Sequence, residues 1–174
     1  MQKTSVVAVK ESRLVGTEVV QKVKRVRLYI LEEQELLRET YGTSFSVEAE
    51  IEVVGLSAAV EPESLGRVLA TLRPDVLLIG TKVLQAAFID KLEASWGKSP
   101  CAGIVLLSAL YEVNSIRRLR AFARKTGSGC AYLFKHSIDN IGQLTGVIQA
   151  VSQGRVIMDP VIMEGLIEAG ESRA

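Results

Sequence analysis

Cysteine, histidine, aromatic residues and long hydrophobic runs are all scarce in this chain of 174 residues. The two cysteines, Cys101 and Cys130, belong to no Cys-x-x-Cys pair, and His136 is the only histidine, so neither a disulfide scaffold nor a zinc site is expected. No apolar run approaches the roughly 18 residues of a membrane span, and charges come too early in the chain for a secretory signal. We therefore expect a cytoplasmic protein with no membrane segment.

The chain also has no large excess of one sign of charge, since 21 basic and 20 acidic residues give a net charge of +1. Nothing in this balance requires nucleic acid or an anionic membrane as a partner. Hydrophobic residues make up 48% of the chain and charged residues 24%, which is typical of a folded globular protein. At this length we expect one domain with additional segments at its ends.

What the sequence does contain is a regular alternation of apolar runs and helical patterns. The predicted strands are 26–31, 51–56, 75–80, 102–109 and 130–135. The predicted helices are 33–41, 62–72, 84–95, 113–125 and a last one from an N-cap at Ser137 to a stop at Gly154. Five such alternations predict an α/β fold, a doubly wound five-stranded parallel sheet with right-handed crossovers.

Two segments lie outside this alternation. Residues 1–24 combine a strand-like stretch with a helix-like one, and the pattern does not decide between them. Residues 155–174 read as a short extended piece, a Pro160 start and a helix from Val161 to Ala169. We predict an N-terminal extension over 1–24, a main domain over 25–154, and a connector segment or short helix over 155–174.

The carboxyl ends of the strands are where parallel α/β sheets place ligands and chemistry. The stretch "RPDVLLIGTKV" ends its strand at a residue without a side chain, although the neighbouring strands end in polar groups. The strand-end residues are Glu32 and Glu33 after the first strand, Gly80 after the third, Ser108 after the fourth, and Lys135 with Tyr132 in the fifth.

Several pieces of the chain, in register, resemble the receiver domain of two-component response regulators, in particular the NarL/LuxR-like group. "VRLYILEEQELLRE" is similar to that family's first strand, acidic pair and first helix, and "LRPDVLLIG" to the strand that leads to the phosphoacceptor. "IVLLSA" and "GSGCAYLFKHS" resemble the strands that carry a Ser/Thr-Ala pair and an aromatic-lysine pair. "LTGVIQAVSQGRVIMDPVIMEGLIEA" resembles the last helix and the connector toward a DNA-binding module. The resemblance implies a CheY-like fold over about residues 25–170.

The resemblance also implies a mechanism: a histidine kinase phosphorylates an aspartate at the third strand, an acidic pair holds Mg²⁺, and the Ser/Thr and lysine bind the phosphoryl group. This chain departs from that pattern, because Gly80 stands at the acceptor position and the acidic pair is Glu-Glu. We therefore expect a degenerate phosphorylation crevice without phosphotransfer, without catalytic residues and without a cofactor. No metal is expected, and Glu32 and Glu33 are the only weak candidates for holding one.

Each crevice residue also has a purely structural interpretation beside the functional one. Glu32 and Glu33 are either carboxylates at a helix N-terminus or a residual cation site, and Lys135 is a candidate to pair with them. Ser108 is either a strand-end hydroxyl bonded locally or a ligand group. Tyr132 is either core packing or a switch-like aromatic, and packing is favoured.

Two residue groups nearby carry weaker signals. Lys82 is a candidate to fill the space left at position 80. The basic run on the fourth helix reads as a solvated face, with docking of an acidic partner as the alternative. Its members are Arg117, Arg118, Arg120, Arg124 and Lys125.

Three functions follow from this pattern. The leading hypothesis is a regulatory receiver-like domain that acts in signal transduction and transcription regulation through phosphorylation-independent protein contact. Its partner is a regulatory protein or a second copy, through the faces of helices one and five or of helix four, strand five and helix five. DNA contact is expected only through a domain beyond Ala174. The alternatives are a small-molecule sensor using the crevice near Gly80 and, least supported, an enzyme.

Overall fold

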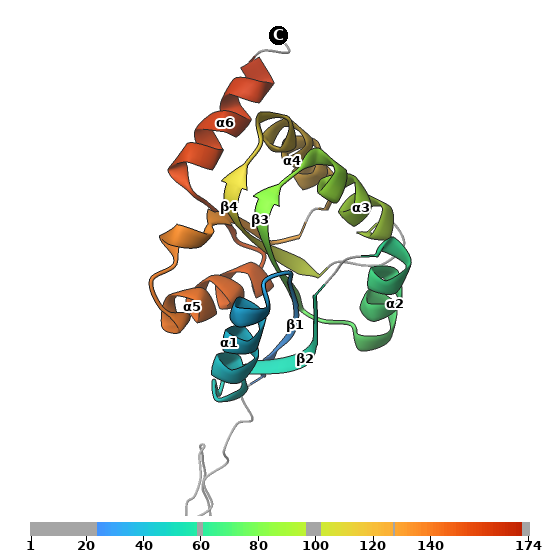
Figure 1. Cartoon of the computed structure of the whole chain (residues 1–174), viewed down its shortest axis with the longest axis vertical. Helices are drawn as coiled ribbons and strands as arrows, with labels where there is room; N and C mark the ends of the chain where they lie inside the picture. Colours follow the sequence, from blue (N-terminus) through green and yellow to red (C-terminus); the bar gives the residue numbers. More distant parts are fainter. Residues whose placement is uncertain (1–23, 59–60, 97–101, 127, 172–174) are drawn as a thin grey trace, which may run out of the picture.

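The computed structural model describes residues 24–58, 61–96, 102–126 and 128–171 (Figure 1). The expectations for residues 1–23 and Cys101 lie outside this part of the chain. A six-stranded parallel sheet in the order β2-β1-β3-β4-β5-β6 forms the centre of the molecule. The strands are β1 (Val26–Glu32), β2 (Ile51–Ser57), β3 (Val76–Leu84), β4 (Gly103–Tyr111), β5 (Cys130–Phe134) and β6 (Val156–Met158).

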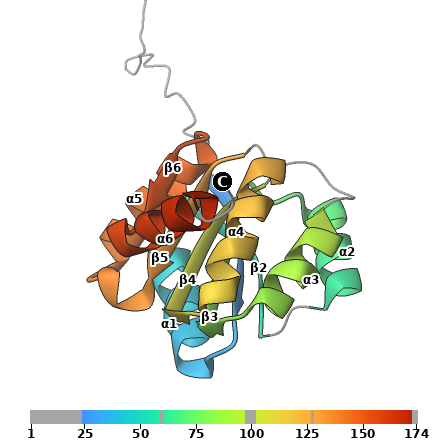
Figure 2. The same ribbon diagram turned by 90° about the horizontal axis from the view of Figure 1, so that it is seen from above.

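Helices cover both faces of the sheet, and each face has its own apolar core (Figures 1 and 2). On one face lie α1 (Glu35–Ser46) and α5 (Ile141–Ser152), packed against one side of the central strands. On the other lie α2 (Pro62–Leu72), α3 (Ala86–Trp96), α4 (Val113–Thr126) and α6 (Pro160–Glu171). The central strands are buried on both faces, which is why they read as continuous hydrophobic runs in the sequence.

The predicted fold class is confirmed, and the number of strands is corrected from five to six. The sixth strand comes from the short extended piece after Gly154, whose φ of +87° ends the α5 segment in the left-handed region that favours glycine. It pairs with β5 through Cys130–Val156 and Tyr132–Met158. Three residues are too few to give a strand pattern in the sequence.

The predicted N-cap of the fifth helix is wrong. Asn140 caps α5, because its side-chain oxygen accepts a hydrogen bond from the backbone N–H of Gln143 at 2.8 Å. Ser137 instead lies in a short 3-10 turn (Lys135–Ser137), where its hydroxyl donates to Asp159 at 2.7 Å. The helix therefore begins later than its apolar spacing suggested.

The third strand does not end at Gly80, contrary to the prediction. Its partner β1 stops there, at the pair Glu32–Gly80, but β3 continues to Leu84 alongside an equally extended β4. The extension pairs Thr81 with Ser108. Beyond the rest of the sheet, β3 and β4 thus form a two-stranded ladder where a loop was expected.

The C-terminal segment, expected as a connector segment or short helix, contains helix α6, which lies on the domain. Helix α6 packs against α4, and Ile162 and Leu166 are buried in the core on that face. Because β6 occupies the edge of β5, the predicted dimer face of helix four, strand five and helix five is covered at its strand. None of the described helices is long and apolar enough to cross a membrane.

Candidate functional site

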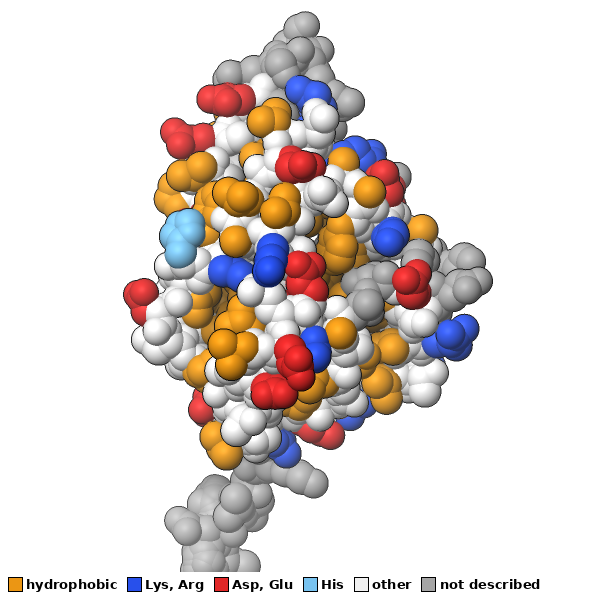
Figure 3. Space-filling model, in the orientation of Figure 1, with side chains coloured by type: hydrophobic (Ala, Val, Ile, Leu, Met, Phe, Trp, Pro, Cys, Tyr) orange, Lys and Arg blue, Asp and Glu red, His pale blue; other side chains and the backbone are white. Residues whose placement is uncertain are grey.

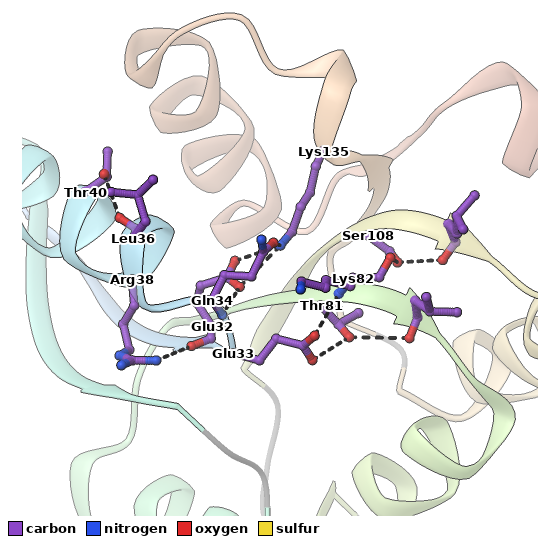
Figure 4. Close-up of polar contacts among 12 residues, drawn as sticks. Glu32, Glu33, Gln34, Leu36, Arg38, Thr40, Thr81, Lys82, Ser108 and Lys135 are labelled. Atoms are coloured by element: carbon purple, nitrogen blue, oxygen red, sulfur yellow. Dashed lines mark hydrogen bonds and ion pairs between the residues drawn. The ribbon is translucent and has the colours of Figure 1, made fainter.

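The predicted crevice residues lie at the carboxyl ends of four strands, and the structure brings most of them together (Figure 4). Glu32 ends β1, Gly80 lies beside it in β3, Ser108 is in β4, and Lys135 follows β5. In the space-filling view, basic and acidic side chains lie next to one another near the centre of one face, with hydrophobic side chains around them (Figure 3).

The Glu32 side chain occupies the space that a side chain at position 80 would need. Glu32 is only 1% exposed, and it is the register partner of Gly80 on the adjacent strand. A Cβ atom added to Gly80 would lie 1.9 Å from Glu32 Oε1 and 2.7 Å from the carboxyl carbon. The space that a side chain at position 80 of β3 would need is therefore filled by a carboxylate from β1.

Lys135 pairs with this buried carboxylate. Its Nζ donates a hydrogen bond to Glu32 Oε2 at 3.2 Å and lies 3.2 Å from Oε1, to which no hydrogen bond is aligned. The same ammonium donates to Gln34 Oε1 at 2.6 Å, and the Gln34 N–H donates to Glu32 Oε2 at 2.8 Å. The ion pair expected between Lys135 and the acidic pair is thus present at Glu32. Gln34 completes it, and no spacing signal in the sequence pointed to that residue.

Glu33 faces the extended part of β3. Its Oε2 accepts from the Thr81 hydroxyl at 2.9 Å and its Oε1 from the Lys82 backbone N–H at 3.1 Å. The Lys82 side chain is exposed, so it does not fill the space at Gly80. Glu33 therefore caps the β3 extension, an interaction that depends on strand residues the sequence reading assigned to a loop.

Ser108 is fully buried and bonded within its own strand end. Its hydroxyl donates to the Leu110 carbonyl at 2.6 Å, with the Lys82 carbonyl at 3.4 Å. These bonds to backbone carbonyls agree with the simpler alternative, a locally bonded hydroxyl.

Tyr132 is also fully buried, in the core beneath α4 and α6. Among the described residues its hydroxyl has no hydrogen-bond partner, and the nearby Cys130 thiol is only a weak hydrogen-bonding group. Burial raises the pKa of Tyr132 well above its usual value of 10. The structure shows this aromatic as core packing.

The residues present do not fit a magnesium ion. Mg²⁺ requires near-octahedral oxygen ligands, and carboxylates usually supply them. Here Glu32 is held against an ammonium group, Glu33 already accepts two hydrogen bonds, and Gly80 has no side-chain ligand atom. No group of three or more metal-binding side chains occurs among the described residues.

A cavity of about 260 Å³ opens beside this cluster. It lies at the ends of β1 and β3, between the start of α2 and helix α3, and Gly80 contributes only backbone to its wall. The residues lining it are Leu31, Glu33, Ala58, Glu61, Ile79, Gly80, Phe88 and Lys91.

Comparison with known proteins establishes the fold. No family model matches the sequence, and a search of curated proteins found no match. The structure is similar to a two-component response regulator of the LuxR family from Aurantimonas sp., with 16% identity and a TM-score of 0.56, covering 85% of this chain and 99% of that one. It is also similar to the isolated REC domain of RcsB from Salmonella enterica serovar Typhimurium, with 13% identity and a TM-score of 0.56, covering 82% and 99%. The response regulator domain of Thermotoga maritima CheB has 18% identity and a TM-score of 0.51, covering 75% and 98%.

At these identities the similarity defines the fold alone. The chain has the CheY-like fold of response-regulator receiver domains, with strand order 2-1-3-4-5 and an added sixth strand. Within that fold, the position next to Glu32 on β3 is a glycine.

Proposed function

We propose that this chain is a receiver-like regulatory domain in signal transduction that acts without phosphorylation, through contact with a protein partner. The observation that carries the proposal is the occupation of the Gly80 side-chain space by the Glu32 carboxylate, itself paired with Lys135. An aspartyl phosphate needs a carboxylate nucleophile at the acceptor strand, and glycine offers none.

Glu32 is a poor substitute as nucleophile. It is 1% exposed, and its two oxygens face an ammonium group and a backbone N–H. A phosphoryl donor would have to displace Lys135 before it could reach this carboxylate. The ion pair therefore favours one fixed arrangement over a switch between two.

A partner contact needs a surface, and the two predicted faces differ. The face at strand five is covered by β6, and α6 packs on α4. We propose that the face of α1 and α5 serves for contact with a partner or a second copy. A role in transcription regulation is a further proposal, supported by the resemblance of the C-terminal segment to the connectors of DNA-binding regulators.

Incubation with acetyl phosphate and Mg²⁺, followed by intact mass spectrometry, tests the proposal. We expect no added mass of about 80 Da, the mass of one phosphoryl group. A receiver domain that is phosphorylated under the same conditions is the positive control. Stoichiometric, Mg²⁺-dependent labelling would refute a phosphorylation-independent mechanism.

A second candidate function is small-molecule sensing, favoured by the cavity beside Gly80. The space expected at Gly80 itself is filled by Glu32, so the cavity and not the missing side chain would supply the site. Ligand sites of α/β proteins lie in this region of the sheet. A thermal-shift screen of metabolites tests the function, because a ligand that binds only the folded state raises the Tm.

A further inference from the structure

The cavity beside Gly80 lies at the topological switch point of the sheet. The chain leaves β1 toward β2 on one side and returns with β3 on the other, so the crevice between the ends of β1 and β3 is the usual ligand position in open α/β sheets. Its volume of about 260 Å³ is just below the range of roughly 300–1,000 Å³ for drug-sized ligands. A metabolite the size of an amino acid suits it.

The inner wall of the cavity is apolar. Ile79 and Leu31 are almost completely buried, and Phe88 is partly buried against the same core. Gly80 adds backbone without a side chain. This wall suits an aliphatic or aromatic group of a ligand.

The rim carries both signs of charge. Glu61 and Lys91 are exposed, and within the described part of the chain neither side chain makes an ion pair or hydrogen bond. Glu33 adds a second carboxylate, held in place by Thr81 and the Lys82 N–H. A ligand with both an ammonium and a carboxylate group complements this rim, whereas an anion alone would face two carboxylates.

We propose that the cavity binds an apolar α-amino acid. Its ammonium group contacts Glu33 and Glu61, its carboxylate contacts Lys91, and its side chain rests on Leu31, Ile79 and Phe88. This inference rests on the sensing function proposed above and names the ligand class and its contacts. A ligand placed in this way contacts the ends of β1 and β3, the start of α2, and helix α3. Binding therefore depends on how these elements are positioned relative to one another.

Isothermal titration of the full chain with L-leucine, L-isoleucine, L-valine, L-methionine and L-phenylalanine tests the proposal. At least one should bind saturably at one site per chain and raise the Tm by about 5 °C at a hundredfold excess over its Kd. Leucinol, which lacks the carboxylate, and 4-methylpentanoate, which lacks the ammonium, should each bind at least tenfold more weakly than L-leucine if leucine binds. Binding that needs only one of the two charged groups contradicts the proposal.

Variants at the rim locate the site. Lys91→Glu and Glu61→Gln should each weaken binding at least tenfold, and both positions are exposed, so folding is expected to be preserved. Lys24→Gln is the matched control, an exposed lysine that does not line the cavity, and it should leave the Kd unchanged.

The outcomes separate the inference from the functions on which it rests. If no apolar amino acid binds but another metabolite raises the Tm and Lys91→Glu abolishes that effect, sensing holds and the ligand class is wrong. If nothing in either experiment binds, both the inference and the sensing function are wrong. The acetyl phosphate experiment is read independently of all these results.

Discussion

At the scale of single residues, the central feature is a carboxylate that reaches its position from the neighbouring strand. Glu32 and Gly80 are side by side in the β1–β3 ladder, and the glutamate side chain lies over the glycine. Lys135, from a third strand end, supplies the opposite charge. A buried carboxylate of this kind is stable only when it is paired and hydrogen-bonded, and Lys135 and the Gln34 N–H meet that requirement.

The first prediction concerns Gly80→Ala. The added methyl group would force the buried Glu32 carboxylate, the end of a flexible side chain, to shift relative to Lys135, and we expect a loss of about 1 kcal/mol in the free energy of unfolding. Gly66→Ala in α2 is the matched control, since nothing lies within 4 Å of the added atom. That change should stabilise the protein by about 0.5–1 kcal/mol, because alanine favours the helix. Urea unfolding measures both, and equal effects would contradict the crowding at Gly80.

The second prediction moves the carboxylate from β1 to β3. Gly80→Asp alone should destabilise the domain, because two carboxylates would compete for one space. Combining it with Glu32→Ala should recover at least about 1 kcal/mol through coupling of these adjacent residues. A double-mutant cycle in urea measures this coupling, and strictly additive effects would show that the two side chains do not share the site.

The third prediction concerns Tyr132→Phe. Within the described part of the chain the buried hydroxyl has no hydrogen-bond partner, so its removal breaks no hydrogen bond and leaves no other polar group without a partner. We expect the free energy of unfolding to stay the same or to rise by up to about 1 kcal/mol. A loss of more than about 1 kcal/mol in urea unfolding would show that the hydroxyl has a partner in solution.

The sequence predicted which residues meet at the crevice, but it did not predict the contacts that they make. The ends of parallel strands meet at one edge, so Glu32, Gly80 and Lys135 were expected to be neighbours. Which of the two glutamates faces Lys135, and that it fills the space at Gly80, depends on side-chain rotamers and on the β1–β3 register. No local pattern in the sequence encodes either.

At the scale of elements, the strand and helix pattern was largely predictable and its edges were not. The strand runs are apolar and the helices have apolar spacing, so both have strong periodic signals. The β3–β4 extension was missed because a glycine in the middle of an apolar run was read as a strand end. Strand β6 has only three residues, and pairing with β5 is what makes it a strand.

The β6–α6 unit is joined to the rest of the domain by hydrogen bonds of Asp159, the residue between the two elements. Its carboxylate accepts a hydrogen bond from the Phe134 N–H at 2.9 Å and another from Ser137 at 2.7 Å. The Asp159 N–H donates to the Tyr132 carbonyl, so this residue joins the end of β6 to the end of β5. Together with the buried side chains of α6, it makes the unit part of the domain.

The fourth prediction follows from this contact. Asp159→Ala leaves the Phe134 N–H without its acceptor, and we expect a loss of about 1–3 kcal/mol. Hydrogen exchange at the amides of β6 and the first turn of α6 should accelerate more than exchange in β1 or β3. Asp139→Ala, at an exposed aspartate whose carboxylate has no partner among the described residues, is the control and should change neither measurement. Uniform acceleration would contradict a local fastening role.

At the scale of the whole molecule, tyrosines buried on both faces of the sheet make the fold sensitive to alkali. Burial raises the pKa of Tyr41 to about 12, and the charge of Glu32 adds to this shift. Burial also raises the pKa values of Tyr111 and Tyr132. Each tyrosine ionises more readily in the unfolded chain, so its stabilising contribution is complete below pH 10 and is lost as the pH rises above that value.

The fifth prediction is therefore a steep loss of stability between about pH 10 and pH 12. Tyr41 alone should account for about 1 kcal/mol at pH 11, because its pKa differs by about two units between the folded and unfolded chains. Urea midpoints at pH 8 and pH 11 measure the loss, and Tyr41→Phe should reduce it. An unchanged midpoint at pH 11 would show that these side chains are accessible to solvent.

For the whole molecule, we propose that the crevice corresponding to the phosphorylation site of receiver domains is filled by the Glu32–Lys135 pair. The most direct measurement is an amide NMR titration with Mg²⁺ and beryllofluoride, a mimic of the phosphoryl group. We expect the resonances of Gly80, Thr81 and Ser108 not to move. A saturable, Mg²⁺-dependent shift of these resonances would show that the crevice still binds a phosphoryl group.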